Sequence, residues 1–151
     1  MSFIGQFPAR LDTKNRLFLP AGFRRILQQS GQQTFVVRRD YFENCLVIYP
    51  MSQWQEELAQ VRSGLNRFNA AEQMVYRKLV SEAQELQLDA NGRILLPKHM
   101  LERVGIEQDV LFVGMEQTIE IWALQNAAVD NDQAFMTDDD FAAKLKKFMT
   151  E

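Results

Sequence analysis

Residues 11–20 read LDTKNRLFLP, and residues 88–97 read LDANGRILLP. The two stretches align without a gap and share an Asp-x-x-x-Arg turn, a short apolar run and a closing proline. Asp12 and Asp89 begin the turns, and Arg16 and Arg93 end them. A segment repeated within one chain indicates two copies of one supersecondary unit that pack together. The duplication therefore predicts two copies of one Asp/Arg arrangement at related places in the fold.

The repeat extends beyond these turns. Each half is expected to give a strand, a turn, a strand, a proline, a short helix, a glycine, two further strands and a helix. We divide the chain into a first repeat (1–50), a two-helix insertion (51–82), a second repeat (83–125) and an acidic tail with a short amphipathic helix (126–151). Half of the chain is about 75 residues, near the lower limit for an independent core. The two repeats are therefore expected to share apolar surface.

Apolar spacing and turn residues predict the secondary structure. Strands are expected over 3–7, 16–19, 34–38, 45–49, 83–88, 93–96, 109–113 and 119–122, and helices over 21–29, 52–62, 70–81, 98–104 and 141–149. Ser52 is expected to cap the second helix, with Gln55 completing a capping box. Gly31 and Gly105 should end the first and fourth helices. Residues expected to face inward from the third helix are Met74, Val75, Leu79 and Val80.

The composition excludes several classes of protein. The single cysteine, Cys45, cannot form an internal disulfide, and its apolar neighbours favour a buried thiol. The single histidine, His99, excludes a multi-histidine metal site and is expected on a helix surface, so we expect neither a metal nor another cofactor. No apolar run approaches the roughly 20 residues that cross a bilayer, and the N-terminus does not resemble a signal peptide. A soluble cytoplasmic protein is expected.

Charge is distributed unevenly along the chain. Residues 1–50 hold seven Lys/Arg and three Asp/Glu, whereas residues 101–151 hold four Lys/Arg and eleven Asp/Glu. Acidic residues of the tail include Asp130, Asp132 and the run 138–140, where we expect a solvated stretch before the final helix. A net charge of −3 therefore leaves room for a local basic face in the first half.

The turns allow two interpretations. In the first, each Asp fixes its turn while Arg16 and Arg93 project and contact phosphates or base edges. The candidate DNA-contacting residues are then Arg10, Lys14, Asn15, Arg16, Asn91 and Arg93, with Asp12 and Asp89 orienting the turns without touching DNA. In the second, each Asp–Arg pair is purely structural and locks its turn. The turn pattern alone favours this second interpretation. Duplication raises the weight of the first interpretation.

A catalytic interpretation is weaker. Asp12 and Asp89 from two repeats could share a proton on a pseudo-twofold axis, as aspartic proteases do. However, the chain reads Asp-Thr-Lys-Asn and Asp-Ala-Asn-Gly, without the glycine expected in that motif, and it is short for a two-lobed protease. We predict no enzyme activity.

The stretches FIGQFPARLDTKNRLFLPAGFR and LQLDANGRILLP resemble the MraZ family of bacterial proteins over most of the chain. The resemblance implies an α+β fold made of two fused copies of an AbrB/SpoVT-like swapped β-hairpin unit, which together form a pseudo-twofold β-barrel core with peripheral helices. Asp12 and Arg16 match the family's first motif, Asp89 and Arg93 match the second, and Lys14 matches the basic position of the first turn. Asn91 replaces a basic residue in the second turn. Asn15 stands where glycine is common, and asparagine tolerates a left-handed backbone.

The resemblance further implies a nucleoid-associated transcriptional regulator. MraZ-like proteins bind short repeats in double-stranded DNA, in the promoter of the division and cell-wall gene cluster that is usually their own operon, and they assemble as homo-oligomeric rings. Few basic residues per subunit suffice when several turns bind together. Two alternatives remain: an antitoxin-like protein-binding module that uses the acidic tail (130–151), and a structural ring without a DNA target.

Overall fold

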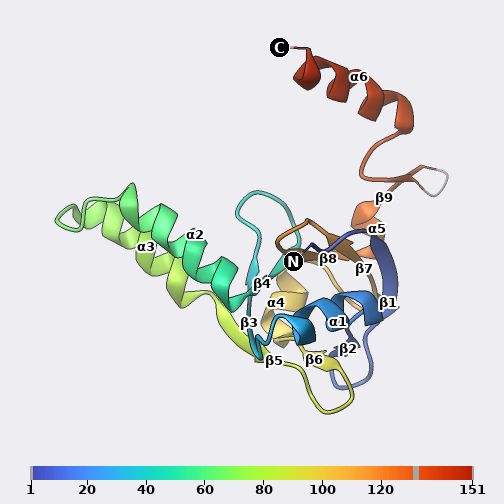
Figure 1. The fold of residues 1–151 in the computed structure, drawn as a ribbon, viewed down its shortest axis with the longest axis horizontal. Coiled ribbons are helices and arrows are strands. Elements are labelled where there is room, and N and C mark those ends of the chain that lie inside the picture. Colours follow the sequence, from blue (N-terminus) through green and yellow to red (C-terminus); the bar gives the residue numbers. More distant parts are fainter. Residues whose placement is uncertain (1, 131–132, 151) are drawn as a thin grey trace.

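The computed structural model of this protein describes residues 2–130 and 133–150. It is a mixed α+β fold around a six-stranded antiparallel sheet in the order β1-β7-β8-β4-β3-β5 (Figure 1). The sheet strands are β1 (Gln6–Arg10), β3 (Thr34–Arg39), β4 (Leu46–Pro50), β5 (Gln84–Gln87), β7 (Asp109–Gly114) and β8 (Ile119–Ala123). Two further strands, β2 (Arg16–Phe18) and β6 (Arg93–Leu95), form a separate antiparallel ribbon. None of the described helices is both long and apolar enough to span a membrane.

Strand pairing links the two halves of the chain. β1 from the first half pairs with β7 from the second, and β5 from the second half pairs with β3 from the first. β4 pairs with β8, and β2 pairs with β6. The strands of the two halves therefore interleave in one six-stranded sheet.

One hydrophobic core serves both halves, as the chain length predicts. Corresponding positions are buried together in it, including Leu17 with Ile94 and Leu19 with Leu96. These four side chains lie on the inner faces of β2 and β6 or directly after them. Because burial of apolar surface is the main stabilising contribution to folding, separating the halves would expose apolar surface on both of them.

A second, smaller core lies on the opposite face of β3 and β4. The helices α2 (Met51–Ser63) and α3 (Ala70–Ser81) form a hairpin that extends to one side of the molecule (Figure 1). Trp54 and Leu79 from this hairpin pack on Tyr49 and Val36 of the sheet. β3 and β4 are therefore covered on both faces, which explains the continuous apolar runs 35–37 and 46–49 within them.

Three helices begin directly after a proline. Pro20, Pro50 and Pro97 occupy the N-cap positions of α1 (Ala21–Gln29), α2 and α4 (Lys98–Arg103). A proline has no N–H group for a strand ladder, so it ends the preceding strand. The expected Ser52 cap is wrong, because Ser52 lies inside α2 and its backbone N–H donates to the Gln32 side chain.

The predicted bounds of α1 and α3 are confirmed, as are the glycines that end two helices. Gly31 and Gly105 have φ values of 73° and 72°, the left-handed conformation of a helix C-terminus. The predicted strand 3–7 is wrong, because β1 begins at Gln6 and Phe3 makes only an isolated bridge with Glu116. Pro8 lies within β1, where it is tolerated because β1 is an edge strand.

The outward face of α3 differs from prediction. Leu79 is buried, but Met74, Val75 and Val80 are exposed. Tyr76 takes their expected place against the second core. α3 contacts the body through one narrow stripe, so helical periodicity in this segment does not identify the buried face.

The tail is more structured than the acidic composition predicts. α5 (Leu124–Ala127) and the strand pair β9 (Ala128–Asp130) and β10 (Gln133–Ala134) follow the sheet, and the Phe135 ring packs edge-on against Trp122. The run 138–140 is the first turn of α6 (Asp138–Met149), which Thr137 caps. The negative charges of this run interact favourably with the positive N-terminal end of the helix dipole. Asp132 lies outside the described residues. α6 stands apart from the body (Figure 1).

Candidate nucleic-acid interface

The two Asp-x-x-x-Arg turns lie at opposite ends of the short antiparallel β2–β6 ribbon, because each turn precedes its own strand. Arg16 faces Leu95 across the ribbon, and Phe18 faces Arg93. These four residues occupy alternate positions on the two strands, so they share the face opposite the core. We call this outer surface, made of Arg16, Phe18, Arg93 and Leu95, the β2–β6 face.

Each aspartate organises its own turn through the same hydrogen bonds. Asp12 Oδ1 accepts the backbone N–H of Lys14 at 2.8 Å and that of Arg16 at 2.9 Å. Asp89 Oδ1 accepts the corresponding N–H groups of Asn91 at 2.8 Å and Arg93 at 2.9 Å. The two turns are therefore one structure formed twice.

Each arginine folds back onto its aspartate. Arg16 Nε donates to Asp12 Oδ2 at 2.7 Å, and Arg93 Nε donates to Asp89 Oδ2 at 2.8 Å. The Arg93 guanidinium also lies 3.9 Å from Asp12 Oδ2, which joins the turns electrostatically. This ion pairing matches the structural interpretation of the turns. The hydrogen bonds use the Nε–H groups, and Arg93 Nη1 makes the longer contact with Asp12, so the Nη–H groups remain as further donors.

The carboxylates are held in the charged state. Hydrogen bonds from the backbone N–H of Arg16, and likewise of Arg93, lower the pKa of Asp12 and Asp89 below the usual range. A proton-sharing carboxylate pair would instead raise one pKa strongly. The arrangement therefore does not support the aspartic protease interpretation.

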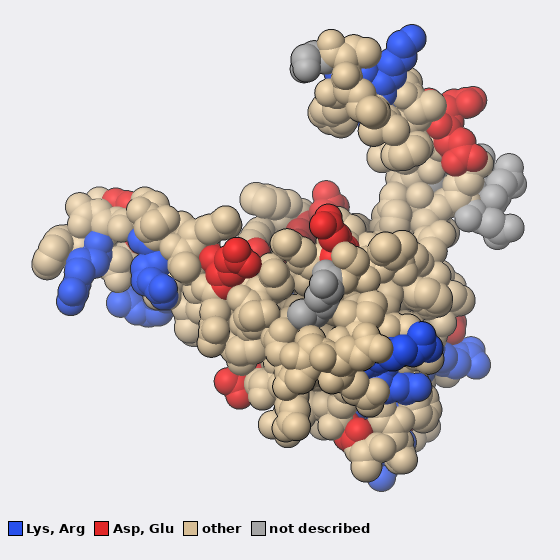
Figure 2. Space-filling model, viewed as in Figure 1, with Lys and Arg blue, Asp and Glu red and all other residues tan. Residues whose placement is uncertain are grey.

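The two arginines are only partly exposed, with 28% of the Arg16 side chain and 20% of the Arg93 side chain accessible. The exposed charge near the first turn is Lys14, for which we find no ion pair in the described part of the chain. Arg10 is further along the sheet edge and pairs with Asp109 at 3.2 Å. Lys and Arg side chains gather over α1 and β1 (Figure 2).

The left-handed positions of the turns are Asn15, with φ 62°, and Gly92, with φ 83°. Asn15 thus adopts the conformation expected from its tolerance for positive φ. Gly92 is buried, and a Cβ atom there would collide with the side chain of Arg24 from α1. Arg24 is a residue that sequence analysis did not single out.

Phe18 and Leu95 were also missed, although both are more than half exposed at the centre of the β2–β6 face. The period-two alternation of a strand would have placed them outside, beside the arginines. The Arg93 guanidinium lies 5.7 Å from the Phe18 ring centre, which fixes it over an apolar surface. The face therefore combines guanidinium donors with exposed apolar groups, a composition that suits base edges and thymine methyl groups.

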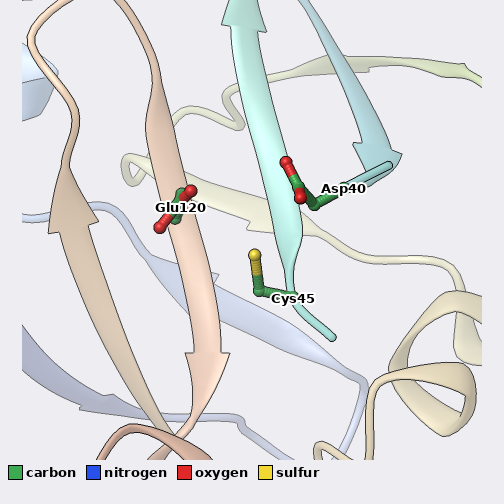
Figure 3. A group of neighbouring side chains, drawn as sticks. All are labelled: Asp40, Cys45 and Glu120. Atoms are coloured by element: carbon green, nitrogen blue, oxygen red, sulfur yellow. The ribbon is translucent and has the colours of Figure 1, made fainter. Parts of the chain in front are cut away.

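Among the described residues, one group resembles a metal site. Ligand atoms of Asp40, Cys45 and Glu120 lie within 4.8 Å of one another, with the Cys45 sulfur between the two carboxylates (Figure 3). Burial raises the pKa of the Cys45 thiol and of Glu120, which disfavours the thiolate that binds metals. Glu120 accepts the Trp122 indole N–H, and Asp40 accepts two backbone N–H groups of the following turn. Cys45 is buried and His99 is exposed, as predicted.

Comparison with known proteins gives a consistent result. The model of the MraZ protein family, which is described as antitoxin-like, matches residues 3–78 and 79–138 as two repeats. A protein of Phocaeicola vulgatus named transcriptional regulator MraZ is 42% identical over 149 residues, covering 99% of this chain and 94% of the relative. A protein of the same name from Bacteroides fragilis is 42% identical over 99% of this chain and 92% of its own length. One from Serratia proteamaculans is 34% identical over 80% of this chain and 78% of its own. The chain therefore belongs to the MraZ family of transcriptional regulators.

Proposed function

We propose that this chain regulates transcription by binding double-stranded DNA in a sequence-specific way through the β2–β6 face and the turns beside it. The observation that carries the proposal is the duplicated arrangement of Arg16 and Arg93 on one outer face, each fixed by an ionised aspartate. A guanidinium held in place by Nε loses little conformational freedom when its Nη groups bind a base or phosphate. Asp12 and Asp89 act as positioning residues.

We assign supporting contacts to Lys14, Asn15, Asn91 and Arg10. Lys14 and Asn91 are exposed at matching positions of the two turns. Lys14 would contact phosphate, whereas Asn91 offers an uncharged amide, so the first turn would contribute more electrostatic affinity. Arg10 would first have to leave Asp109.

The strand exchange between the halves supports an AbrB/SpoVT-like swapped-hairpin barrel, in which the first repeat (1–50) and the second (83–125) exchange β1 and β5. We assign residues 51–82 to an insertion and residues 126–151 to a tail. Our proposal includes assembly into a ring and binding to short repeats in the promoter of its own operon, within the division and cell-wall gene cluster. Several weak turns acting together would then give the affinity that one subunit lacks.

A second function is favoured by one observation. α6 carries exposed Phe141, Leu145 and Phe148 on one side, beyond the part of the tail that packs on the sheet. An antitoxin-like module would hold a protein partner with such a segment. Copurification of a stoichiometric partner that depends on residues 138–149 would favour this function.

The experiment is a mobility-shift titration on the DNA upstream of the protein's own gene, beside a scrambled sequence, at two salt concentrations. Wild-type protein should shift the upstream DNA selectively and bind more weakly at higher salt. Arg16→Ala and Arg93→Ala should each cost about 1–3 kcal/mol per DNA contact, and Lys14→Ala should lower the salt slope by about one per contacting turn.

The matched control is Arg67→Ala, which removes one exposed positive charge in the loop between α2 and α3, away from the β2–β6 face. Its affinity should equal that of wild type, and thermal melts should show that all variants are folded. Equal affinity for scrambled DNA, or unchanged binding by both arginine variants, would refute the proposed function.

A further inference from the structure

A groove between α3 and α4 plays no part in the proposed DNA contact. It has a volume of about 620 Å³, and its lining includes Arg38 and Arg39 of β3. Its apolar lining includes Val75 and Leu79 of α3, Met100 of α4 and the Tyr41 ring. Val75 is more than half exposed there, although it is a large apolar residue on a helix. We call this feature the α3–α4 groove.

The charged residues of the α3–α4 groove are predominantly basic. Arg38, Arg39, Lys78 and Arg103 line it, against the carboxylates of Asp40 and Glu82. Glu82 is already paired with Lys78 at 2.9 Å. The groove therefore presents an excess of positive charge beside an apolar floor.

Arg38 is a buried cation of the groove lining whose hydrogen bonding is incomplete. Only 6% of this residue is exposed, and its Nε–H is buried without a hydrogen-bond acceptor. An unsatisfied buried donor on a charged group costs free energy. An acidic group entering the groove would give Arg38 a partner of opposite charge nearby.

α6 has the complementary composition. Phe141, Leu145 and Phe148 recur at helical spacing on one side of it and are exposed. Its first turn consists of three aspartates, whereas Lys146 and Lys147 lie in its last turn, so the negative charge is concentrated at its start. Figure 1 shows α6 apart from its own sheet, and Figure 2 shows acidic side chains at its start. An amphipathic helix with anchors at i, i+4 and i+7 is the kind of segment that fills an apolar groove.

We propose that the α3–α4 groove of one copy binds α6 of a second copy of this chain. The apolar anchors would cover Val75 and Leu79, and the acidic first turn would approach Arg38 and Arg103. Because the helix and the groove are different surfaces, each copy inserts its α6 into one neighbour and receives the α6 of another neighbour in its groove. Such a head-to-tail contact produces a ring when its rotation closes. This inference rests on the ring assembly of the proposed function and assigns its interface.

The test measures mass by sedimentation velocity on the full chain without DNA. The helix variant carries Phe141→Ser and Phe148→Ser, and the groove variant carries Val75→Glu, a change to a strong helix former at an exposed position. Wild type should form closed oligomers larger than a dimer, and each variant alone should be monomeric. A mixture of the two variants should form only a heterodimer, because it holds one intact helix and one intact groove per pair.

Control variants remove apolar or positively charged surface elsewhere. Ala143→Ser lies on the opposite side of α6, and Phe68→Ser removes an exposed ring from the loop between α2 and α3. Both should keep the wild-type mass. Arg103→Glu in the groove should weaken assembly at least tenfold in subunit concentration, whereas Arg67→Glu outside it should not.

Several outcomes would overturn the inference. A monomeric wild type would overturn it. Self-association of the groove variant would also overturn it, because it would indicate that α6 pairs with α6. A mixture that stays monomeric would also do so. Parallel mobility shifts separate this inference from DNA binding: a ring without sequence preference leaves the interface standing, and specific DNA binding by a monomer leaves the DNA contact standing.

Discussion

The two Asp-x-x-x-Arg turns have the same internal hydrogen bonds but different surroundings. The first turn has Asn15 at its left-handed position and exposed Lys14 beside it, whereas the second has buried Gly92 and uncharged Asn91. Counted from the prolines Pro20 and Pro97, α1 carries Arg24 where α4 carries Leu101, and Arg24 is the side chain against Gly92. Duplication preserved the local geometry of the turns, while the neighbouring helices made them unequal.

The inequality extends to the arginines. Arg93 contacts both Asp89 and Asp12 and lies over Phe18, whereas for Arg16 the described ion pairs include only Asp12. Arg93 is also the less exposed of the two. The second turn therefore holds the pair of turns together, and the first offers the more accessible positive charge.

The largest expected effect concerns the shared support of the turns. Leu17 and Ile94 face each other across the ribbon and are fully buried. Leu17→Ala and Ile94→Ala should each lower the free energy of unfolding by about 2–5 kcal/mol, because each leaves a cavity in the core. Urea denaturation of the two variants measures this.

The outer-face control for this comparison is Leu95→Ala, which should cost about 1 kcal/mol or less because the side chain is exposed. Nearly equal losses for Leu17→Ala and Ile94→Ala would show that the turns share one support. A much smaller loss for one of them would mean that the halves are stabilised separately.

An intermediate effect is expected at the left-handed positions. Gly92→Ala should cost about 1–2 kcal/mol, because a side chain is disfavoured at positive φ, and Arg24 must also move. Asn15→Gly should be nearly neutral, because it removes a mild backbone strain but makes the unfolded chain more flexible. Thermal unfolding monitored by circular dichroism compares them.

Gly22→Ala serves as the control for this pair. It lies in α1, and a Cβ atom there meets nothing within 4 Å. The change should stabilise the protein by about 0.5–1 kcal/mol. A neutral Gly92→Ala would contradict the proposed reason for the difference between the turns.

The smallest effect is expected from pH near neutrality. The folded pKa values of Asp12 and Asp89 are lowered, so their stabilising contribution is present above the ordinary aspartate pKa of about 3.9 and is lost as pH falls through the folded values. The melting temperature should therefore not change between pH 6 and 8 because of these groups, and it should fall below about pH 4.

Asp12→Asn and Asp89→Asn should each remove part of the acid-dependent loss of stability. Equal reductions would show that the two aspartates contribute alike in spite of their different surroundings. A wild-type transition near pH 6 that disappears in either variant would contradict the lowered pKa values.

Much of the local structure follows from the sequence. The bounds of α1 and α3 were predicted, because helical periodicity and end signals such as Gly31 after α1 act over a few residues. The N-cap of α2 was predicted wrongly. Pro50 ends β4 and the helix begins directly after it, so Ser52, a residue that favours N-cap positions, already lies inside the helix. The inward side of α3 also depended on which surface the hairpin meets.

The sequence by itself determined the repeat, the shared core, the two turns and the left-handed conformation of Asn15, since these depend on short-range sterics, hydrogen bonds and total apolar surface. Only the tertiary structure decided that β1 and β5 pair with the opposite halves, that Arg93 also lies beside Asp12 of the other turn, and that Arg24 covers the second turn. The α3–α4 groove likewise exists only where helices distant in sequence meet. Such features depend on contacts between distant segments, which no local pattern encodes.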